Sequence, residues 1–195
     1  MPAEEIEAKI RVPDPEAFRR RLADRGRTPR DTVFEVNRLF DDAGGSLRRS
    51  GSALRLREEF SAAAGGAAAP VRTLLTFKGP MVESRLKRRP ETELAVEAAG
   101  PMIDILAGLG LAETFRYEKR RTRFAGGRCE VVLDELPHLG FFAEVEGPGE
   151  EAVLAELADL GLADVPLLRA NYVRLLIDHL RGAGLDASRA VFEGG

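Results

Sequence analysis

Charged side chains alternate with apolar ones near the start of the chain, and their types are those that bind metal ions and phosphates. Glu5, Glu7 and Lys9 occupy every second position there. Because successive side chains of a β-strand point to opposite sides of the sheet, these three share one face. Carboxylates are ligands that Mg²⁺ prefers, and Lys and Arg side chains bind phosphate oxygens. Such a face could hold a divalent cation beside a phosphate.

The same alternation recurs farther along the chain. The polar faces carry Arg55 and Arg57, Thr76 and Lys78, Glu130 and Asp134, and Glu144 and Glu146. Two arrangements fit this pattern: the charges face water around an apolar core, or they line a tunnel whose outer apolar faces lie under helices. Opposite charges inside a narrow barrel are costly to desolvate unless they pair with each other or with a ligand. A charged tunnel would therefore suit a polyphosphate and its cation.

The elements that must position these charges are short strands with a few helices. Strand-like alternation covers residues 5–11, 34–41, 53–59, 72–78, 91–97, 116–124, 129–134 and 141–146. Helical spacing follows Asp14 and recurs in 101–109, 150–160 and 170–180. Short strands separated by turn signals favour an antiparallel barrel or sandwich, and closing the sheet removes its edges. We expect an α+β fold.

Composition limits the classes of function. The length of 195 residues fits one domain, which we place at residues 1–182, with a flexible tail at 183–195 and a mobile Ala/Gly loop at 61–70. A net charge of −3 argues against nucleic-acid binding. The first twenty residues show no apolar stretch after a basic start, and no run of about 18 apolar residues occurs, so we expect no signal sequence or membrane span and a cytoplasmic protein. With one cysteine and two histidines, any metal must sit on oxygen ligands.

The segment from Glu5 to Lys9 matches the ExExK signature of the CYTH superfamily, the triphosphate tunnel metalloenzymes that include class IV adenylyl cyclases and thiamine triphosphatases. Further matches follow in order: NRLFDD at 37–42, SGSALRLRE at 50–58, LTFKGP at 75–80, RPETE at 89–93, EKRRTRF at 118–124, VVLDELPHLGFFAEVEG at 131–147 and NYVRLL at 171–176. The chain most resembles the class IV adenylyl cyclase branch. The resemblance implies a closed antiparallel eight-stranded β-barrel with helices packed on the outside.

The resemblance also implies roles for individual residues. The metal ligands for Mg²⁺ or Mn²⁺ would be Glu5, Glu7, Asp134, Glu144 and Glu146, and Glu5, Glu7 and Asp134 would form the catalytic set. The triphosphate would be bound by Lys9, Arg55, Arg57, Lys78, Arg89, Lys119 and Arg121. For Asp134, pairing with a barrel arginine is an equally good interpretation. The neighbouring basic residues Arg85, Lys87 and Arg88 are typical of a solvated surface.

Three functions remain open at this stage. The resemblance favours a cyclase that converts ATP to cyclic AMP and pyrophosphate. The alternative is a triphosphatase that hydrolyses tripolyphosphate, thiamine triphosphate or a nucleoside triphosphate, and a third is a non-catalytic module that binds polyphosphate or nucleotide. The partner is thus ATP or another triphosphate, and the cyclase branch suggests a homodimer.

The tunnel arrangement makes a geometric prediction. The charges that should converge on one lumen are Glu5, Glu7, Lys9, Arg55, Arg57, Lys78, Lys119, Arg121, Asp134, Glu144 and Glu146. The residues that should instead contact helices outside the barrel are Ile6, Ile10, Leu54, Leu56 and Phe77. A shift of one residue in strand register would reverse every assignment.

Overall fold

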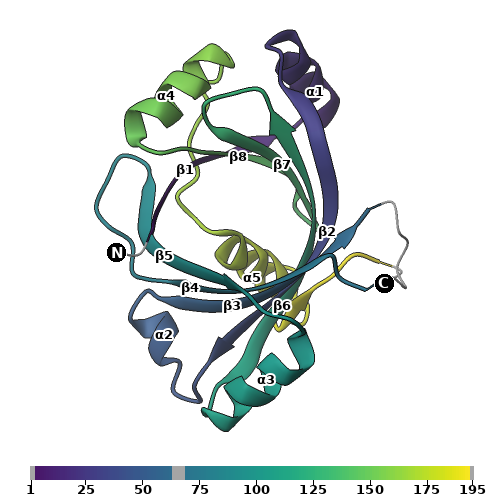
Figure 1. Ribbon diagram of the computed structural model, residues 1–195, viewed down its shortest axis with the longest axis vertical. Helices are drawn as coiled ribbons and strands as arrows, with labels where there is room; N and C mark the ends of the chain where they lie inside the picture. The colour runs from purple at the N-terminus through teal and green to yellow at the C-terminus, as the bar shows by residue number, and fades with distance from the viewer. Residues whose placement is uncertain (1–2, 63–68, 194–195) are drawn as a thin grey trace.

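The computed structural model describes residues 3–62 and 69–193, and within them eight antiparallel strands close into a barrel (Figure 1). The strands are β1 (Ala3–Val12), β2 (Thr28–Asp41), β3 (Ala53–Ser61), β4 (Arg72–Lys78), β5 (Lys87–Ala95), β6 (Ala112–Ala125), β7 (Glu130–Leu136) and β8 (Gly140–Glu146). Their order around the barrel is β2-β3-β4-β5-β1-β8-β7-β6, and pairing of β6 with β2 closes it. The α+β barrel expected from the sequence is confirmed. Most of the expected 61–70 loop, residues 63–68, lies outside the described residues.

The described residues also form five helices, α1 (Pro15–Asp24), α2 (Ser46–Arg49), α3 (Ala99–Gly108), α4 (Glu150–Asp159) and α5 (Tyr172–Gly182). Helix α1 begins after Asp14, whose carboxylate accepts a hydrogen bond from the backbone N–H of Ala17 at 2.9 Å. Such a cap satisfies one of the free N–H groups of the first turn. None of the helices in this part of the chain has the length and apolarity that a membrane crossing requires.

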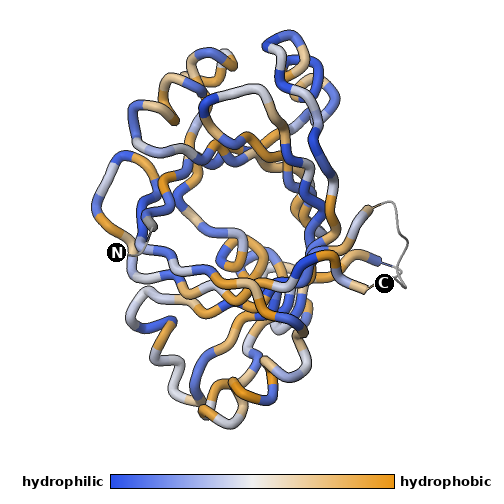
Figure 2. Tube along the Cα trace, viewed as in Figure 1, coloured by the Kyte–Doolittle hydropathy of each residue, from blue (hydrophilic) through white to orange (hydrophobic). Residues whose placement is uncertain are grey.

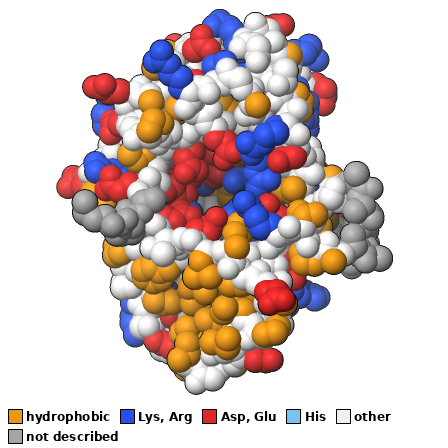
Figure 3. Space-filling model, viewed as in Figure 1, with side chains coloured by type: hydrophobic (Ala, Val, Ile, Leu, Met, Phe, Trp, Pro, Cys, Tyr) orange, Lys and Arg blue, Asp and Glu red, His pale blue; other side chains and the backbone are white. Residues whose placement is uncertain are grey.

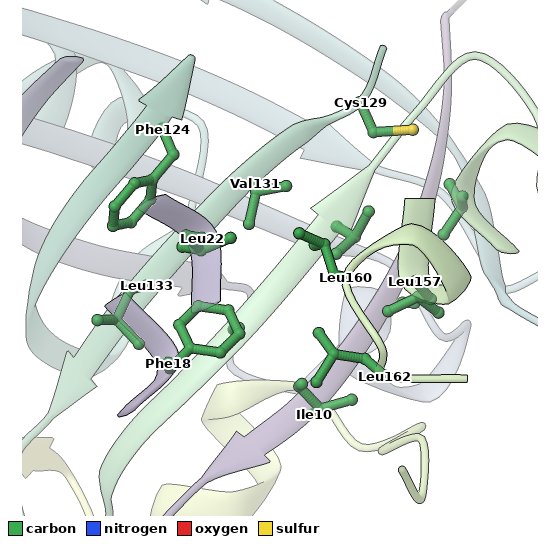
Figure 4. Close-up of a cluster of buried hydrophobic side chains, with 14 of the residues drawn as sticks. Ile10, Phe18, Leu22, Phe124, Cys129, Val131, Leu133, Leu157, Leu160 and Leu162 are labelled. Atoms are coloured by element: carbon green, nitrogen blue, oxygen red, sulfur yellow. The ribbon is translucent and has the colours of Figure 1, made fainter. Parts of the chain in front are cut away.

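The outward faces of the strands lie under helices α1, α3 and α4. Ile6 and Ile10 of β1 belong to a buried cluster with Phe18 and Leu22 of α1 and with Leu157 of α4. Figure 4 shows the helical side chains of this cluster pointing toward the strands. On the other side, Leu54 and Leu56 of β3 pack in a cluster with residues of α3. The predicted outward direction is confirmed for these four strand residues.

The prediction for Phe77 is wrong, because its side chain is 42% exposed. Phe77 lies two residues beyond Leu75, which does pack against the α3 cluster. Strand β5 leads into α3 near Ala95, which pairs with Leu74. The ten-residue helix therefore covers that end of β4 and leaves Phe77 uncovered.

Helix α5 packs on the lumen side of the barrel rather than on its outer surface. Its residues Tyr172, Leu176 and Leu180 form a buried cluster with Tyr117 of β6 and Phe142 of β8. These two strand residues lie on the same faces as the lumen charges two positions away. Figure 1 shows α5 across the barrel opening. The lumen face is thus apolar at one end and charged elsewhere. Figure 2 shows hydrophilic and hydrophobic residues following one another along the strands of the barrel.

The segment expected to form a flexible tail contains the short strand β9 (Arg189–Ala190). It pairs in parallel with Arg116 and Tyr117 of β6. The ring of Phe192 follows, with the guanidinium of Arg120 4.1 Å from its centroid. Strand β9 thus extends the edge of β6, and its Ala190 is buried in the cluster that contains Tyr117 and Tyr172.

Candidate functional site

The barrel encloses a cavity of about 940 Å³ with opposed acidic and basic walls. It is lined by Glu5, Glu7, Lys9, Arg55, Arg57, Lys78, Lys119, Arg121, Glu144 and Glu146, together with Arg89 at the rim. The acidic wall comes from the neighbouring strands β5, β1 and β8, and most of the basic wall comes from β6 and β3. Figure 3 shows this hollow with acidic side chains gathered on one side and basic ones on the other. Of the two arrangements that alternation allowed, the structure has the tunnel, and every predicted lumen charge except Asp134 lines it.

On the acidic wall, two buried glutamates are held by lysines. The Nζ of Lys78 donates to Glu5 at 2.6 Å, and the Nζ of Lys87 donates to Glu7 at 2.6 Å. Burial would raise the pKa of Glu5, but Lys78 and Lys87 lower it more, and the result lies below the usual 4.5. Glu5 is therefore ionised at neutral pH.

Glu146 lies directly opposite Glu7 in the pairing of β8 with β1. Partial burial raises the pKa of Glu146 to about 7, and the nearby carboxylates of Glu5 and Glu7 add to the effect. Negative charge is therefore in excess at this position. A cation bound there would relieve the repulsion.

The carboxylate oxygens of the acidic wall are potential ligands for a metal ion. Among the described residues no three carboxylates are already grouped around a common ion position. Lysines contact the oxygens of Glu5 and Glu7 instead. One oxygen of Glu5, Oε2, is nevertheless buried without a hydrogen bond. Oxygen donors are the type that Mg²⁺ and Mn²⁺ take. The donor set fits such an ion once the lysines move aside.

The basic wall is organised around a buried glutamate that the sequence reasoning missed. Glu35 is fully buried, and its carboxylate lies 3.5 Å from Lys119, 3.5 Å from Arg57 and 3.8 Å from Arg121. Asn37 donates to it at 3.2 Å. Burial would raise the pKa of Glu35, but the surrounding cations, Lys119 first, lower it far more. Glu35 therefore stays charged and offsets part of the positive charge of these three cations.

Asp134 stands behind the basic wall and does not line the cavity. Its two oxygens accept bonds of 2.7 Å each from the Nε and Nη2 atoms of Arg121. Lys119 also donates to it, at 3.3 Å. A bidentate pair of this kind fixes both the position and the orientation of a guanidinium. The arrangement favours pairing with a barrel arginine, and a role of Asp134 as a metal ligand stays a prediction.

Lys87 and Arg89 are placed differently from their basic neighbours. The expectation of a solvated surface is wrong for Lys87, which is 8% exposed and bound to Glu7. Strand β5 begins at Lys87, four residues before the predicted start, so its side chain alternates into the lumen. Arg89 reaches the rim, where it donates to the carbonyls of Gly79, Gly51 and Lys78. These backbone contacts hold Arg89 at one end of the cavity.

Several buried polar atoms in the lumen wall and directly behind it lack hydrogen-bond partners within the described residues. They are Glu5 Oε2, Glu35 Oε1, Asn37 Oδ1, Arg55 Nε, Arg57 Nε and Tyr172 OH. Buried polar groups in folded proteins are nearly always satisfied by protein, water or ligand. Four of these residues, Glu5, Arg55, Arg57 and Tyr172, line the cavity, which indicates that the cavity binds water or a polar ligand.

Comparison with known proteins agrees with the fold. A model of the CYTH domain family matches residues 3–161. A Methanocaldococcus jannaschii protein named "putative adenylate cyclase" is 25% identical over 183 residues, which cover 91% of this chain and 98% of that protein. A solved structure from Pyrococcus horikoshii OT3 has a TM-score of 0.75 at 21% identity, with 90% and 99% of the two chains covered. A Hippeastrum "putative adenylyl cyclase", described as revealing a dominant triphosphatase activity, has a TM-score of 0.67 at 20% identity, with 93% and 96% covered.

Proposed function

The chain belongs to the CYTH domain family, and on that premise we propose that it is a metal-dependent enzyme that acts on a triphosphate. The observation that carries the proposal is the enclosed cavity, in which an acidic wall faces a basic wall across the barrel. A linear anion with its cation matches this division of charge. The proposal extends to ATP as the substrate and to cyclic AMP and pyrophosphate as the products.

The basic wall would bind the phosphate chain. Arg55 and Arg57 present guanidinium groups that can donate two hydrogen bonds to a phosphate, and Lys119 supplies a point charge. Arg57 already contacts Glu93 at 3.1 Å and Glu35 at 3.5 Å. Phosphate oxygens would replace some of these carboxylate contacts. The positive charge of Arg57 would thus be paired both before and after the anion binds.

The acidic wall would hold the divalent cation, and CYTH enzymes generally depend on one. Glu5, Glu7 and Glu146 are the carboxylates best placed to bind Mg²⁺ or Mn²⁺, with Glu144 beside them. When bound, the ion neutralises phosphate charge and polarises the reacting phosphoryl group. The chain's own lysines, Lys78 and Lys87, would then turn from the carboxylates toward the substrate.

Two reactions can use this set of charges, because phosphoryl and nucleotidyl transfer need positioning and charge stabilisation more than a covalent protein group. In a cyclase, the ribose 3′-hydroxyl attacks the α-phosphorus, its proton is lost, and pyrophosphate leaves. In a triphosphatase, water attacks the terminal phosphorus and releases phosphate. The name of the M. jannaschii relative favours the first reaction, and the Hippeastrum description favours the second.

The products formed from ATP labelled at the α-phosphate separate the candidates. With Mg²⁺ or Mn²⁺ present, chromatography is expected to show labelled cyclic AMP with an equal amount of pyrophosphate. Labelled ADP with free phosphate would replace the cyclase by the triphosphatase. If the protein bound ATP or tripolyphosphate tightly and converted neither, it would be a non-catalytic binding module.

Substitution of Arg57 tests the basic wall. Arg57→Ala is expected to weaken tripolyphosphate binding by about 1.5–3 kcal/mol, the range for a hydrogen bond to a charged group. Burial and the neighbouring Arg55 lower the pKa of Arg57, whereas Glu35 and Glu59 favour its charged form. Both carboxylates keep other cations, Lys119 and Arg123, when Arg57 is removed, so the free energy of unfolding should change little. Calorimetry of tripolyphosphate binding and thermal unfolding measure the two effects.

The control for this substitution is Arg38→Ala. Arg38 follows Asn37, which lies opposite Arg57 in the pairing of β2 with β3. Arg38 forms ion pairs with Glu58 and Glu113. It does not line the cavity. Its removal should leave tripolyphosphate affinity unchanged. Equal effects of the two substitutions would place Arg57 outside the binding site.

A further inference from the structure

The first residue of α5, Tyr172, occupies a fixed position in the charged lumen. Asn171 caps the helix by accepting a hydrogen bond from the backbone N–H of Arg174 at 2.8 Å. The ring of Tyr172 meets the ring of Phe142 edge to face, with 5.5 Å between centroids. The side chain is 5% exposed, although it contributes to the cavity lining. Packing from the strand and the helix therefore holds this ring in one orientation.

Two of the lumen's lysines lie against this ring. The Nζ of Lys9 lies 3.9 Å from the ring centroid, and the Nζ of Lys119 lies 5.4 Å from it. Both lysines are almost completely buried, at 2% exposure each. An aromatic face attracts a nearby ammonium group, most strongly where water is excluded. The ring thus helps to set the positions of two cations that line the cavity.

The hydroxyl of Tyr172 has no hydrogen-bond partner among the described residues, although it is buried. A buried hydroxyl without a partner is costly, so native proteins rarely keep one without a reason. A hydroxyl can donate to an anionic oxygen, and an anion that bridges Lys9 and Lys119 would lie next to this ring. The orphaned hydroxyl is a donor without an acceptor, and it belongs to a ring that two buried lysines approach.

We propose that Tyr172 is a binding and positioning residue for the phosphate chain: its hydroxyl donates to a phosphate oxygen, and its ring holds Lys9 and Lys119 in place. This inference rests on the proposed function, because it takes the cavity to be a triphosphate site. The hydroxyl and the ring have different roles, the first in binding phosphate and the second in positioning the two lysines. The two can be removed one after the other.

Tyr172→Phe removes the hydroxyl and keeps the ring. With Mg²⁺ present, it is expected to weaken tripolyphosphate binding by about 10-fold to 100-fold, the equivalent of a hydrogen bond to a charged group. In turnover assays the loss should appear mainly in KM, because the contact is made before and during the reaction. Tyr172→Leu also removes the aromatic face, and we expect a larger loss of affinity together with a lower kcat.

The matched control is Leu176→Val, one turn farther along the same buried face of α5. It disturbs the packing of the helix but touches neither function of Tyr172. Its melting temperature should fall while tripolyphosphate affinity stays at the wild-type value. Wild-type affinity in Tyr172→Phe, or an equal loss in Leu176→Val, would overturn the role of Tyr172. Failure of the wild-type protein itself to bind tripolyphosphate or ATP would overturn the proposed function and this inference together.

Discussion

Glu5→Gln is expected to reduce triphosphate turnover by about 100-fold or more, because it removes a charged oxygen ligand from the acidic wall while keeping the volume of the side chain. The fold should survive, since Lys78 keeps a second partner in Glu91 at 2.7 Å. Burial of Glu5 is more than offset by Lys78 and Lys87, which lower its pKa, so the ionised carboxylate stabilises the folded protein at neutral pH. That contribution disappears as the pH falls through the lowered pKa.

Three measurements check the expectation for Glu5. They are the rate of product formation, the rise in melting temperature on addition of Mg²⁺, and the far-UV circular dichroism spectrum. The control is Glu4→Gln, at the neighbouring position, where an exposed carboxylate pairs with Arg88 at 2.7 Å. Glu4 points away from the cavity, so its variant should behave as wild type. A well-folded Glu5→Gln protein with wild-type turnover would refute the metal-binding role of the acidic wall.

The sequence was sufficient to predict the barrel and the direction of most of its charges, because strand alternation is a local property of the backbone. Glu5, Glu7 and Lys9 reach the lumen for the same reason that Ile6 and Ile10 reach the helices. The family motifs then selected the interior over the solvated arrangement. Along β1, the alternation of charged and apolar residues agrees with the directions that these side chains take in the barrel. The direction of each side chain could therefore be predicted there from the sequence.

Other features depend on contacts between distant segments. Lys87 turns inward because β5 extends back to pair with Glu7, and the start of a strand is fixed by its partner as well as by its own residues. The amphipathic pattern of α5 indicated a buried face but not which surface it would cover. Only the structure shows that this face enters the barrel end against Phe142 and Tyr117.

Glu35 illustrates a signal that was present but not used. It lies on the same face of β2 as Asn37, within the strand predicted at 34–41, and alternation places it in the lumen. A single carboxylate on a strand is usually solvated, so its charge alone gave no reason to select it. Its role becomes evident only from the cations that β3 and β6 bring around it.

Asp134→Asn is expected to reduce the free energy of unfolding by about 3–5 kcal/mol, the cost of breaking a buried ion pair by removing one partner. The variant keeps the volume of the side chain but loses the charge that Arg121 and Lys119 share. Because Arg121 loses its bidentate partner, tripolyphosphate affinity should also fall. Mg²⁺ affinity should change little, since Asp134 does not line the cavity.

The adjacent pair on the outer face of the same two strands provides the control. Glu135 binds Arg120 at 3.1 Å, as Asp134 binds Arg121, but both partners are open to solvent. Glu135→Gln should therefore cost less than about 1 kcal/mol and leave ligand binding unchanged. Chemical denaturation gives the stability difference, and calorimetry with Mg²⁺ and with tripolyphosphate gives the two affinities. If Asp134→Asn lowered Mg²⁺ affinity as much as Glu5→Gln does, Asp134 would be a metal ligand. Its primary role would then not be to position Arg121.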